Sequence, residues 1–292
     1  MGEIVVKHNA LINASYNLEL TEQRLILLAI INARESGQGV DSNNILRIHA
    51  SDYLKHFEVD KHAAYEALKN AAYGIFHRQF SYTLTDEKTG KTKKTLSRWV
   101  QKISYIDEEG ILELAFTIDV VPLITQLEEN FTRYQLKQVT QLTSKYAIRL
   151  YELLIAWRNN CKTPTYKLAD FRNRLGVEES EYKLMHQFKS RVLDLAVGQI
   201  NEHTDITAKY EQHKAGRLIT GFSFTFKFKS AAKAASKAVV TLPKEPDPDT
   251  EKREAYAQFL NYQRQAKLLG DSIEQLANEK EVEQFREFGF LK

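Results

Sequence analysis

Cysteine is almost absent from this chain of 292 residues, which contains only Cys161. A disulfide framework and a zinc site of the CxxC type are therefore excluded. Glycine, with 12 residues, and proline, with 5, are also scarce, which favours long helices and strands over tight turns. The chain has no apolar run long enough to span a membrane and no apolar signal segment at its start, so we expect a cytoplasmic protein with no membrane partner.

Motifs of nucleotide-processing enzymes are missing as well. A phosphate-binding P-loop needs a glycine five residues before its Gly-Lys-Ser/Thr end, but Thr85 stands at that distance from Gly90-Lys91-Thr92. A metal-dependent strand-nicking enzyme would carry paired histidines on a strand, and the 8 histidines contain no HxH pair. We therefore expect no catalytic activity, no cofactor and no metal.

The net positive charge is small for the whole chain but large in some segments. The formal net charge is only +3, yet residues 61–104 carry +6, residues 105–130 carry −7 and residues 131–229 carry +8. A protein that binds a polyanion needs local positive faces and not a high total charge. The two basic blocks are therefore compatible with nucleic-acid binding.

The first part of the chain predicts a defined series of elements. Hydrophobic periodicity gives helix 21–34 with Thr21 as its cap, strand 45–48, helix 51–57, helix 61–77 with Asp60 as its cap, a strand around 80–84, a turn at 89–91, and strands 95–106 and 111–118 joined by turn 107–110. The helix at 61–77 is predicted to bury one line of residues, Ala64, Leu68, Ala72 and Phe76. Residues 119–142 are interpreted as a helical connector.

The same order of elements then starts again. The pattern gives helix 143–159 with Thr143 as its cap, strand 165–168, helix 170–175, helix 180–201, a strand from 206, a turn at 215–217 and a strand at 218–228. Phenylalanines at 222, 224, 226 and 228 predict a strand with one aromatic face. The expected core face of helix 180–201 consists of Met185, Phe188, Val192, Leu195, Ala196 and Gln199.

Individual residues support an internal duplication. The short helices correspond at an offset of 118 residues, as shown by Asp52-Tyr53 and Asp170-Phe171. The long helices correspond at an offset of 124, which pairs Gly74 with Gly198, and Gly90 pairs with Gly216 in the hairpin turns. Three helices closed by a hairpin form the winged-helix variant of the helix-turn-helix. We therefore predict an α+β fold with two tandem winged-helix domains and a C-terminal helical extension.

Basic residues fall on the parts of this motif that approach DNA. The second helix of the turn can enter a major groove, and the hairpin can reach the neighbouring backbone. Lysine and arginine suit phosphate and guanine, and glutamine suits adenine. The candidates for DNA contact are Lys183, His186, Gln187, Lys189, Ser190 and Arg191 on the second long helix, Lys209, Lys214 and Arg217 by the second hairpin turn, and Lys69, Arg78, Lys91, Lys93, Lys94, Arg98 and Lys102 in the first unit.

Three stretches carry a resemblance to a known family. Residues 6–12 followed by 20–25, residues 144–154 (SKYAIRLYELL), and residues 188–193 (FKSRVL) running on to 199–201 resemble signatures of iteron-binding plasmid replication initiators. These stretches occur in the family's order and spacing, and the resemblance extends over about residues 5–229. It leaves residues 230–292 uncovered.

The resemblance implies different roles for two winged-helix domains. A first domain, over residues 1–125, would make backbone contacts and dimerise, and a second, over residues 126–229, would read the bases, with Lys189 and Arg191 at the family's groove-reading positions. Such proteins bind direct repeats in a plasmid origin as monomers and repress their own gene as dimers on an inverted repeat. The implied partners are double-stranded DNA, a second copy in equilibrium with the monomer, and the host replication initiator and helicase.

Two alternatives remain open from the sequence. A winged-helix transcription repressor with no replication role would bind DNA by the same physics, and only the family signatures favour an initiator. Residues 230–249, rich in alanine and lysine and then in proline and acidic residues, predict a flexible linker. Residues 250–292 have helical composition, and they fit either a docking helical hairpin or a loosely ordered tail.

Overall fold

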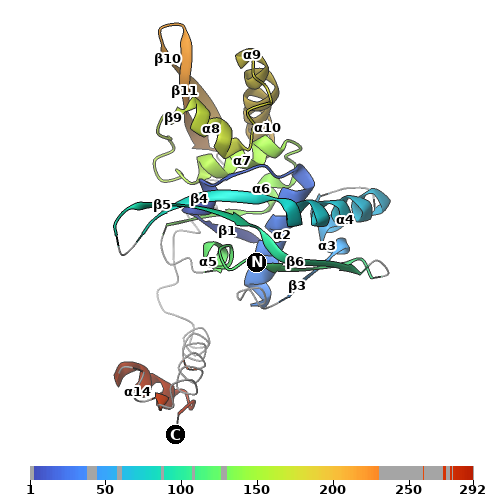
Figure 1. Cartoon of the computed structure of the whole chain (residues 1–292), viewed down its shortest axis with the longest axis vertical. Helices are drawn as coiled ribbons and strands as arrows, with labels where there is room; N and C mark the ends of the chain where they lie inside the picture. The colour runs from blue at the N-terminus through green and yellow to red at the C-terminus, as the bar shows by residue number, and fades with distance from the viewer. Residues whose placement is uncertain are drawn as a thin grey trace. The chain divides into compact units, whose positions relative to one another are not determined.

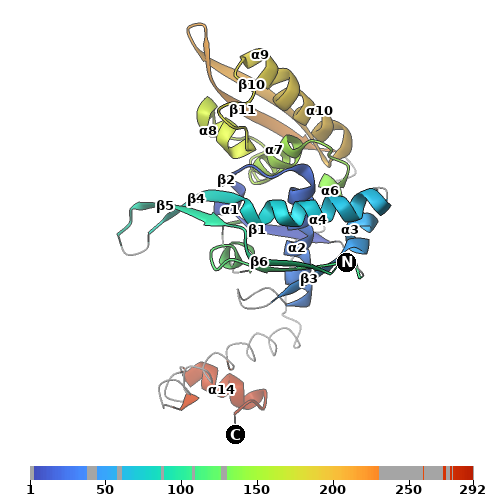
Figure 2. The same cartoon turned by 45° about the vertical axis from the view of Figure 1, so that its right-hand side comes forward.

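The computed structural model describes residues 3–37, 45–57, 61–86, 89–106, 109–125, 130–229, 259, 272–273, 277 and 279–291. The chain divides into a compact unit over Met1–Ala232 and a second over Lys233–Lys292, and each is considered by itself. The predicted cap Asp60 and the predicted linker 230–249 lie outside the described residues, as does the side chain of Ala64. Figures 1 and 2 show the first unit from two directions.

The first half of this unit mixes helices with short antiparallel strands. Its elements in chain order are β1 (Ile4–His8), α1 (Asn9–Ile12), β2 (Ser15–Tyr16), α2 (Leu20–Ser36), β3 (Leu46–His49), α3 (Ala50–Phe57), α4 (Lys61–His77), β4 (Gln79–Thr85), β5 (Thr92–Arg98), β6 (Val100–Ile106), β7 (Ile111–Phe116), α5 (Val121–Thr125), β8 (Phe131–Gln135) and α6 (Lys137–Thr140). The helices expected at 21–34, 51–57 and 61–77 are confirmed.

Helix α2 is the central buried helix of the first domain, since its residues from Glu22 to Ile31 are all buried. The expected cap Thr21 is wrong, because the helix is capped two residues earlier at Glu19. The backbone N–H of Glu19 donates to the Glu22 carboxylate at 2.7 Å, which closes a capping box. Glu22 thereby satisfies a backbone donor that precedes the first turn.

Helix α4 packs against α2 through one stripe, Leu68, Ala71, Ala72 and Ile75. The predicted core residue Phe76 is wrong, because 37% of it is exposed. A row of residues spaced by four drifts by about 40° at each step, so three steps turn Phe76 well away from the start of the row. Ile75 takes the buried position at that end of the helix.

The strands of the first domain form separate sheets. One three-stranded sheet has the order β3-β7-β6, and another has the order β2-β4-β5. The single strand predicted at 95–106 is wrong, because the chain leaves one sheet and enters the other at Trp99. The Trp99 ring is fully buried, with its centroid 5.0 Å from that of Tyr16 and 4.8 Å from that of Phe80. The ring packs on the β2-β4-β5 sheet at the residue where the chain passes to the other sheet.

The predicted helical connector at 119–142 is also wrong, because it contains strand β8. Residues 131–135 pair antiparallel with β1, in a register that places Val6 opposite Arg133. Alternation within five residues gives only a weak local signal, and the partner strand is more than 120 residues away in sequence. This pairing ties the first residues of the chain to the segment that follows the predicted domain boundary at 125/126.

The second half of the unit repeats the plan with longer wing strands. Its elements are α7 (Lys145–Ile155), β9 (Tyr166–Lys167), α8 (Leu168–Leu175), α9 (Met185–Phe188), a π-helical turn η1 (Lys189–Leu193), α10 (Asp194–His203), β10 (Ile206–Ala215) and β11 (Leu218–Phe228). The sheet order is β10-β11-β9, with β11 in the middle. The aromatic face predicted for 218–228 is confirmed, since Phe222, Phe224 and Phe226 are buried.

The same sheet order identifies the true wing of the first domain. In each domain a short strand, β3 in the first and β9 in the second, pairs with the last strand of a hairpin. The hairpin β6–β7 therefore corresponds to β10–β11. The turns correspond at Gly110 and Gly216, both with φ of +61°. The predicted match between Gly90 and Gly216 is therefore wrong, and β4–β5 is an additional hairpin. Gly90 and Gly110 both lie in hairpin turns, so the sequence could not show which hairpin is the wing, because strand pairing is not local in sequence.

The long helix of the second domain begins later than predicted and is not uniform. Residues 180–184 are not helical, and the helix runs from Met185 with the π-helical turn inside it. A π-helical turn adds a residue and shifts every side chain beyond it around the axis. The predicted core residue Leu195 is therefore wrong, with 45% exposed, while Leu193 is fully buried.

The start of helix α7 is held by a side chain of α10. Ser144 is its N-cap residue, so the predicted cap Thr143 is wrong. The Gln199 side-chain oxygen accepts from the backbone N–H groups of both Thr143 and Ser144, at 3.1 and 3.0 Å. Gln199, expected on the core face, thus lies where α10 reaches the start of α7.

The second unit contains the helix α14 (Glu279–Glu287) among its described residues. The Phe285 ring is fully buried, with its centroid 5.6 Å from that of Phe259. Phe290 continues the cluster, 5.8 Å from Phe259. An aromatic cluster thus joins two parts of the extension.

Candidate nucleic-acid interface

The second domain presents a helix and a wing at one end. Both views show the start of α9 and the turn of the β10–β11 hairpin side by side at the tip of the unit (Figures 1 and 2). The aromatic rings beneath them hold this arrangement, with Phe188 of the helix 6.2 Å from Phe222 of the strand. Helix and wing thus form one surface on a shared rigid core.

The predicted residues of the helix lie largely on its solvent face. His186, Ser190 and Arg191 are exposed, and Gln187 is partly exposed. Lys183 is exposed as well, but it precedes the helix and is not part of it, contrary to its predicted place. The π-helical turn covers residues 189–193, so it sets the direction of Ser190 and Arg191. Such turns are frequent at functional sites.

Lys189 lies at the junction between helix and wing. Its Nζ atom donates to the Gln212 side chain at 3.4 Å and lies 5.8 Å from the centre of the Tyr210 ring. The Tyr210 hydroxyl donates to Asp194 at 2.7 Å. Burial and the neighbouring carboxylate raise the pKa of Tyr210 to about 12, which keeps this donor protonated. Lys189 is therefore oriented by β10, at the predicted edge of the core.

The wing carries its own cations. Lys209, Lys214 and Arg217 are exposed along β10 and the turn. A β-bulge lies between His213 and Lys214, where the register of the hairpin shifts. The register there passes over Thr220, so the extra residue lies on β11 and bends that strand close to the wing turn.

The additional hairpin of the first domain holds the remaining basic cluster. Lys91, Lys93, Lys94 and Arg98 are exposed on or beside β5, and Lys102 is exposed on β6. The hairpin projects from the side of the first domain in both views (Figures 1 and 2). The structure thus places these lysines on an arm, and not on the wing of this domain. In sequence, the acidic residues 107–109 stand between β6 and β7, the two strands of that wing.

Two predicted candidates have structural partners within the first domain. The Arg78 guanidinium donates through Nε to both carboxylate oxygens of Glu22, at 2.9 and 3.2 Å. The Lys69 ammonium lies 5.7 Å from the centre of the Tyr105 ring. Arg78 therefore holds the start of α2 against the end of α4.

Exposed leucines were missed by reasoning from charge. Leu184, just before α9, is 56% exposed, and Leu218, directly after the wing turn, is 76% exposed. Both stand beside predicted cations at the tip of the second domain. Their signal in the sequence is an apolar residue directly beside a predicted DNA-contacting cation, Lys183 for Leu184 and Arg217 for Leu218.

A buried ionic cluster joins α7 to the N-terminal strands. The Glu152 carboxylate accepts from Lys7 at 2.6 Å, from Arg149 at 2.6 Å and from Tyr134 at 2.7 Å. Arg149 also donates to the carbonyl oxygens of Ile12 and Ala14, the residues between β1 and β2. Burial would raise the pKa of Glu152, but the two cations and the hydrogen bonds hold it at about 2.

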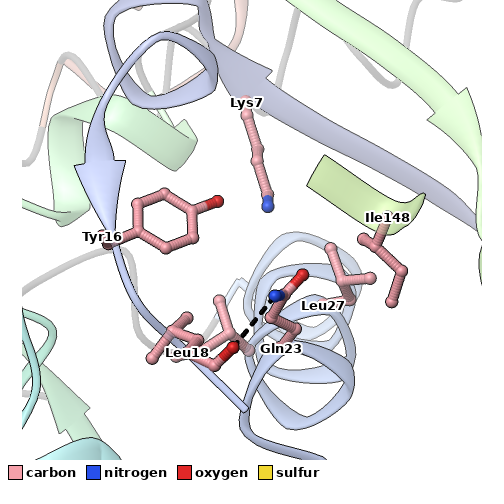
Figure 3. A pocket seen from close by; sticks show the side chains of 7 residues that line it. Lys7, Tyr16, Leu18, Gln23, Leu27 and Ile148 are labelled. Atoms are coloured by element: carbon pink, nitrogen blue, oxygen red, sulfur yellow. Dashed lines mark hydrogen bonds between the residues drawn. The ribbon is translucent and has the colours of Figure 1, made fainter. Parts of the chain in front are cut away.

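Figure 3 shows the narrow pocket beside this cluster, into which Lys7 points between Tyr16 and Gln23. Gln23 donates to the backbone oxygens of Leu18 and Lys145, which links α2 to the start of α7. The cluster and the pocket therefore lie where the first domain meets the second. They fix α7, on which α10 packs.

Sites for other chemistry are not evident in the part of the chain that the structure describes. It shows no group of three or more histidine, cysteine or acidic side chains that could hold a metal ion. It shows no helix long and apolar enough to cross a membrane.

Comparison with known proteins decides the family. The model described as "Initiator Replication protein, WH1" matches residues 4–155, and the model described as "Initiator Rep protein, WH2" matches residues 167–226. The chain belongs to the initiator replication protein family. WH1 and WH2 hereafter name the first and second winged-helix domains by the predicted bounds 1–125 and 126–229, whereas the matched range of the first model extends to residue 155.

Relatives agree with this membership. An uncharacterized 27.6 kDa protein of Escherichia coli is 26% identical over 223 residues, which cover 74% of this chain and 92% of that protein. The PI protein of Escherichia coli is 29% identical over 143 residues, 44% of this chain and 47% of that protein. A replication initiation protein of Escherichia coli is 26% identical over 199 residues, 65% of this chain and 58% of that protein.

Among solved structures, the Pi initiator protein in complex with iteron DNA shares the fold, with a TM-score of 0.63 and 21% identity. The likeness covers 78% of this chain and 98% of the Pi chain. The WH1 domain of MSBI1.176, a replication protein isolated from a multiple sclerosis patient, is 48% identical over 38% of this chain, with a TM-score of 0.32.

Proposed function

We propose that this protein initiates plasmid replication by binding direct repeats in double-stranded origin DNA, and that it does so without catalysis, in the cytoplasm. One observation carries the proposal: the exposed polar face of α9 and η1 lies beside the basic wing of WH2, on one rigid core. A helix-turn-helix places its second helix in the major groove, and here the wing can reach the flanking backbone. Membership of the initiator family and the iteron DNA in the Pi complex support origin repeats as the target.

Within this proposal, the residues of WH2, over residues 126–229, divide by chemistry. Arg191 is exposed and its guanidinium suits the two acceptors of guanine, while Gln187 suits adenine. Lys189 is held by Gln212 and Tyr210 at the edge of the reading face. Lys183, His186 and Ser190 surround them, and the wing residues Lys209, Lys214 and Arg217 suit phosphate contacts.

WH1, over residues 1–125, has a different role in the proposal. Its hairpin β4–β5 presents Lys91, Lys93 and Lys94 to the phosphate backbone, supported by Arg98 and Lys102. The acidic residues 107–109, between β6 and β7 in sequence, repel phosphate and do not favour a DNA contact there. WH1 also forms the homodimer that represses the initiator's own gene, and the host replication initiator and helicase are the protein partners.

Footprinting on the DNA that flanks the coding gene tests the proposal. We expect protection of tandem direct repeats, with an affinity that falls steeply as salt rises, because bound lysines and arginines release counterions. Protection of a single palindrome alone would instead identify a transcription repressor. An affinity that does not change with salt would overturn the assignment of the basic surfaces.

A further inference from the structure

Leu184 is an exposed apolar residue at the start of the reading helix. It lies immediately before Met185, the first residue of α9, and 56% of it is exposed. Its neighbours Lys183 and His186 are exposed and polar, while Met185 packs against the core. Both views place this end of the helix beside the wing turn (Figures 1 and 2).

The capping role of this position does not account for a leucine here. Leu184 is the N-cap residue, with φ of −82° and ψ of 129°, and its side chain forms no capping hydrogen bond. Serine, threonine, aspartate and asparagine are favoured at this position because their oxygens satisfy the free N–H groups of the first turn. Leucine offers no such oxygen, and its exposed surface gains little from burial. Its backbone oxygen accepts from Phe188, which any residue could do.

The place of Leu184 matches one feature of duplex DNA. In a helix-turn-helix, residues at the start of the second helix meet the base edges in the major groove. The apolar feature exposed there is the C5-methyl group of thymine. Two exposed cations that precede and follow Leu184 in sequence, Lys183 and Arg191, complement the phosphates that flank a groove.

We propose that Leu184 reads a base, by packing on the C5-methyl group of a thymine in the bound repeat. This inference rests on the proposed function, since it requires α9 to lie in the major groove of the target. It adds an apolar residue to the polar residues proposed to read the bases, Arg191, Lys189 and Gln187.

Two other exposed leucines provide matched controls. Leu195 is 45% exposed on α10, about 16 Å further along the same helix at 1.5 Å per residue. Leu218 is 76% exposed beside Arg217 on the wing. The wing reaches the DNA backbone in this proposal, where no C5-methyl group is present.

The test couples a protein change to a DNA change. Synthetic duplexes of the footprinted repeat would carry deoxyuridine in place of each thymine in turn, which removes one methyl group. Binding at one salt concentration would be measured for the wild type, Leu184→Ala, Leu195→Ala and Leu218→Ala. One replacement should weaken the wild type about fourfold, the effect of one buried methyl group. The same replacement should not weaken Leu184→Ala further, while both controls keep the full wild-type response.

The outcomes separate this inference from the proposed function. If Leu184→Ala retains the wild-type response at every thymine, or binds the unmodified repeat as tightly as the wild type, the base-reading role is overturned. If the wild type protects no repeat in the footprint, the proposed function itself fails. Thermal unfolding of each variant shows whether the fold is intact, and we expect no change for an exposed side chain.

Discussion

At the scale of single residues, the position of a charge in the fold decides its role. Arg149 and Arg191 are both arginines of the basic block 131–229, yet Arg149 is fully buried and Arg191 is exposed. Arg149 and Lys7 neutralise the buried Glu152, whereas Arg191 is available to an external partner. Charge counting identified the block but could not separate these two classes. Arg78 illustrates the same limit, since Glu22 holds its guanidinium.

Glu152→Gln should destabilise the first unit by about 3–5 kcal/mol, because it leaves Lys7 and Arg149 buried without a counter-charge. Urea unfolding at pH 7 measures the loss. The folded pKa of about 2 lies below the ordinary value of 4.5, so this carboxylate contributes stability above pH 4.5. That contribution disappears as the pH falls from about 4.5 to about 2.

The variant should therefore lose less stability than the wild type across that pH window. Glu202→Gln is the control, since the Glu202 side chain is 74% exposed and should behave like the wild type. Equal slopes of unfolding free energy against pH for Glu152→Gln and the wild type would contradict the role assigned to the cluster.

At the scale of elements, local sequence predicted the helices well and the sheets poorly. Helices α2, α3, α4 and α8 lie close to where periodicity placed them, because their hydrogen bonds and buried faces repeat within a few residues. The additional hairpin β4–β5 and the β1–β8 pair depend on partners far apart in the chain. The π-helical turn at Lys189–Leu193 left no periodic signal, so the face of α10 was misassigned.

Gly74 and Gly198 correspond in the duplicated helices but should respond in opposite ways to alanine. A Cβ at Gly74 would lie 2.1 Å from Glu22 Oε1, whose carboxylate is fixed by Arg78 and by the cap of α2. Gly74→Ala should cost about 1–3 kcal/mol. A Cβ at Gly198 meets nothing within 4 Å, so Gly198→Ala should stabilise by about 0.5–1 kcal/mol. Denaturant midpoints measure both, and equal effects would refute the close contact of α2 and α4.

Replacing Lys91, Lys93 and Lys94 by alanine tests the hairpin β4–β5 as a phosphate-binding arm. We expect weaker binding to all duplexes and a salt slope smaller by about 2.7, which corresponds to three lost phosphate contacts. Arg191→Ala should instead reduce discrimination between the repeat and unrelated DNA. Lys227→Ala, on the exposed face of β11 away from the wing turn, is the control that should leave binding unchanged. If the hairpin and Arg191 variants behaved alike, the division into arm and reading helix would be wrong.

At the scale of the whole molecule, the chain consists of two copies of one plan with different charge. WH2 joins a basic wing to its helix, while WH1 places its lysines on the additional hairpin and has acidic residues between the two strands of its wing in sequence. The small total charge of +3 conceals this alternation. The buried cluster around Glu152 connects the copies through α7. In the proposed function, one copy reads bases and the other holds the backbone.

A chain ending after residue 229 should bind the repeat with wild-type affinity and salt dependence. The first unit, over Met1–Ala232, contains every proposed contact, and the extension has its own aromatic core around Phe285. Equilibrium binding of the shortened and full chains compares them directly. A loss of affinity in the shortened chain would make the extension part of the DNA site.

The sequence by itself determined most of the helices, the presence of two winged-helix units, the basic blocks and the family signatures, because each of these is a pattern that can be followed along the chain. Only the tertiary structure decided which hairpin is a wing, which arginines are buried and that Leu184 stands exposed at the start of the reading helix. Strand pairing, desolvation and exposure depend on residues brought together from distant parts of the chain. A local pattern specifies the elements, and their packing selects the side chains that remain free to meet DNA.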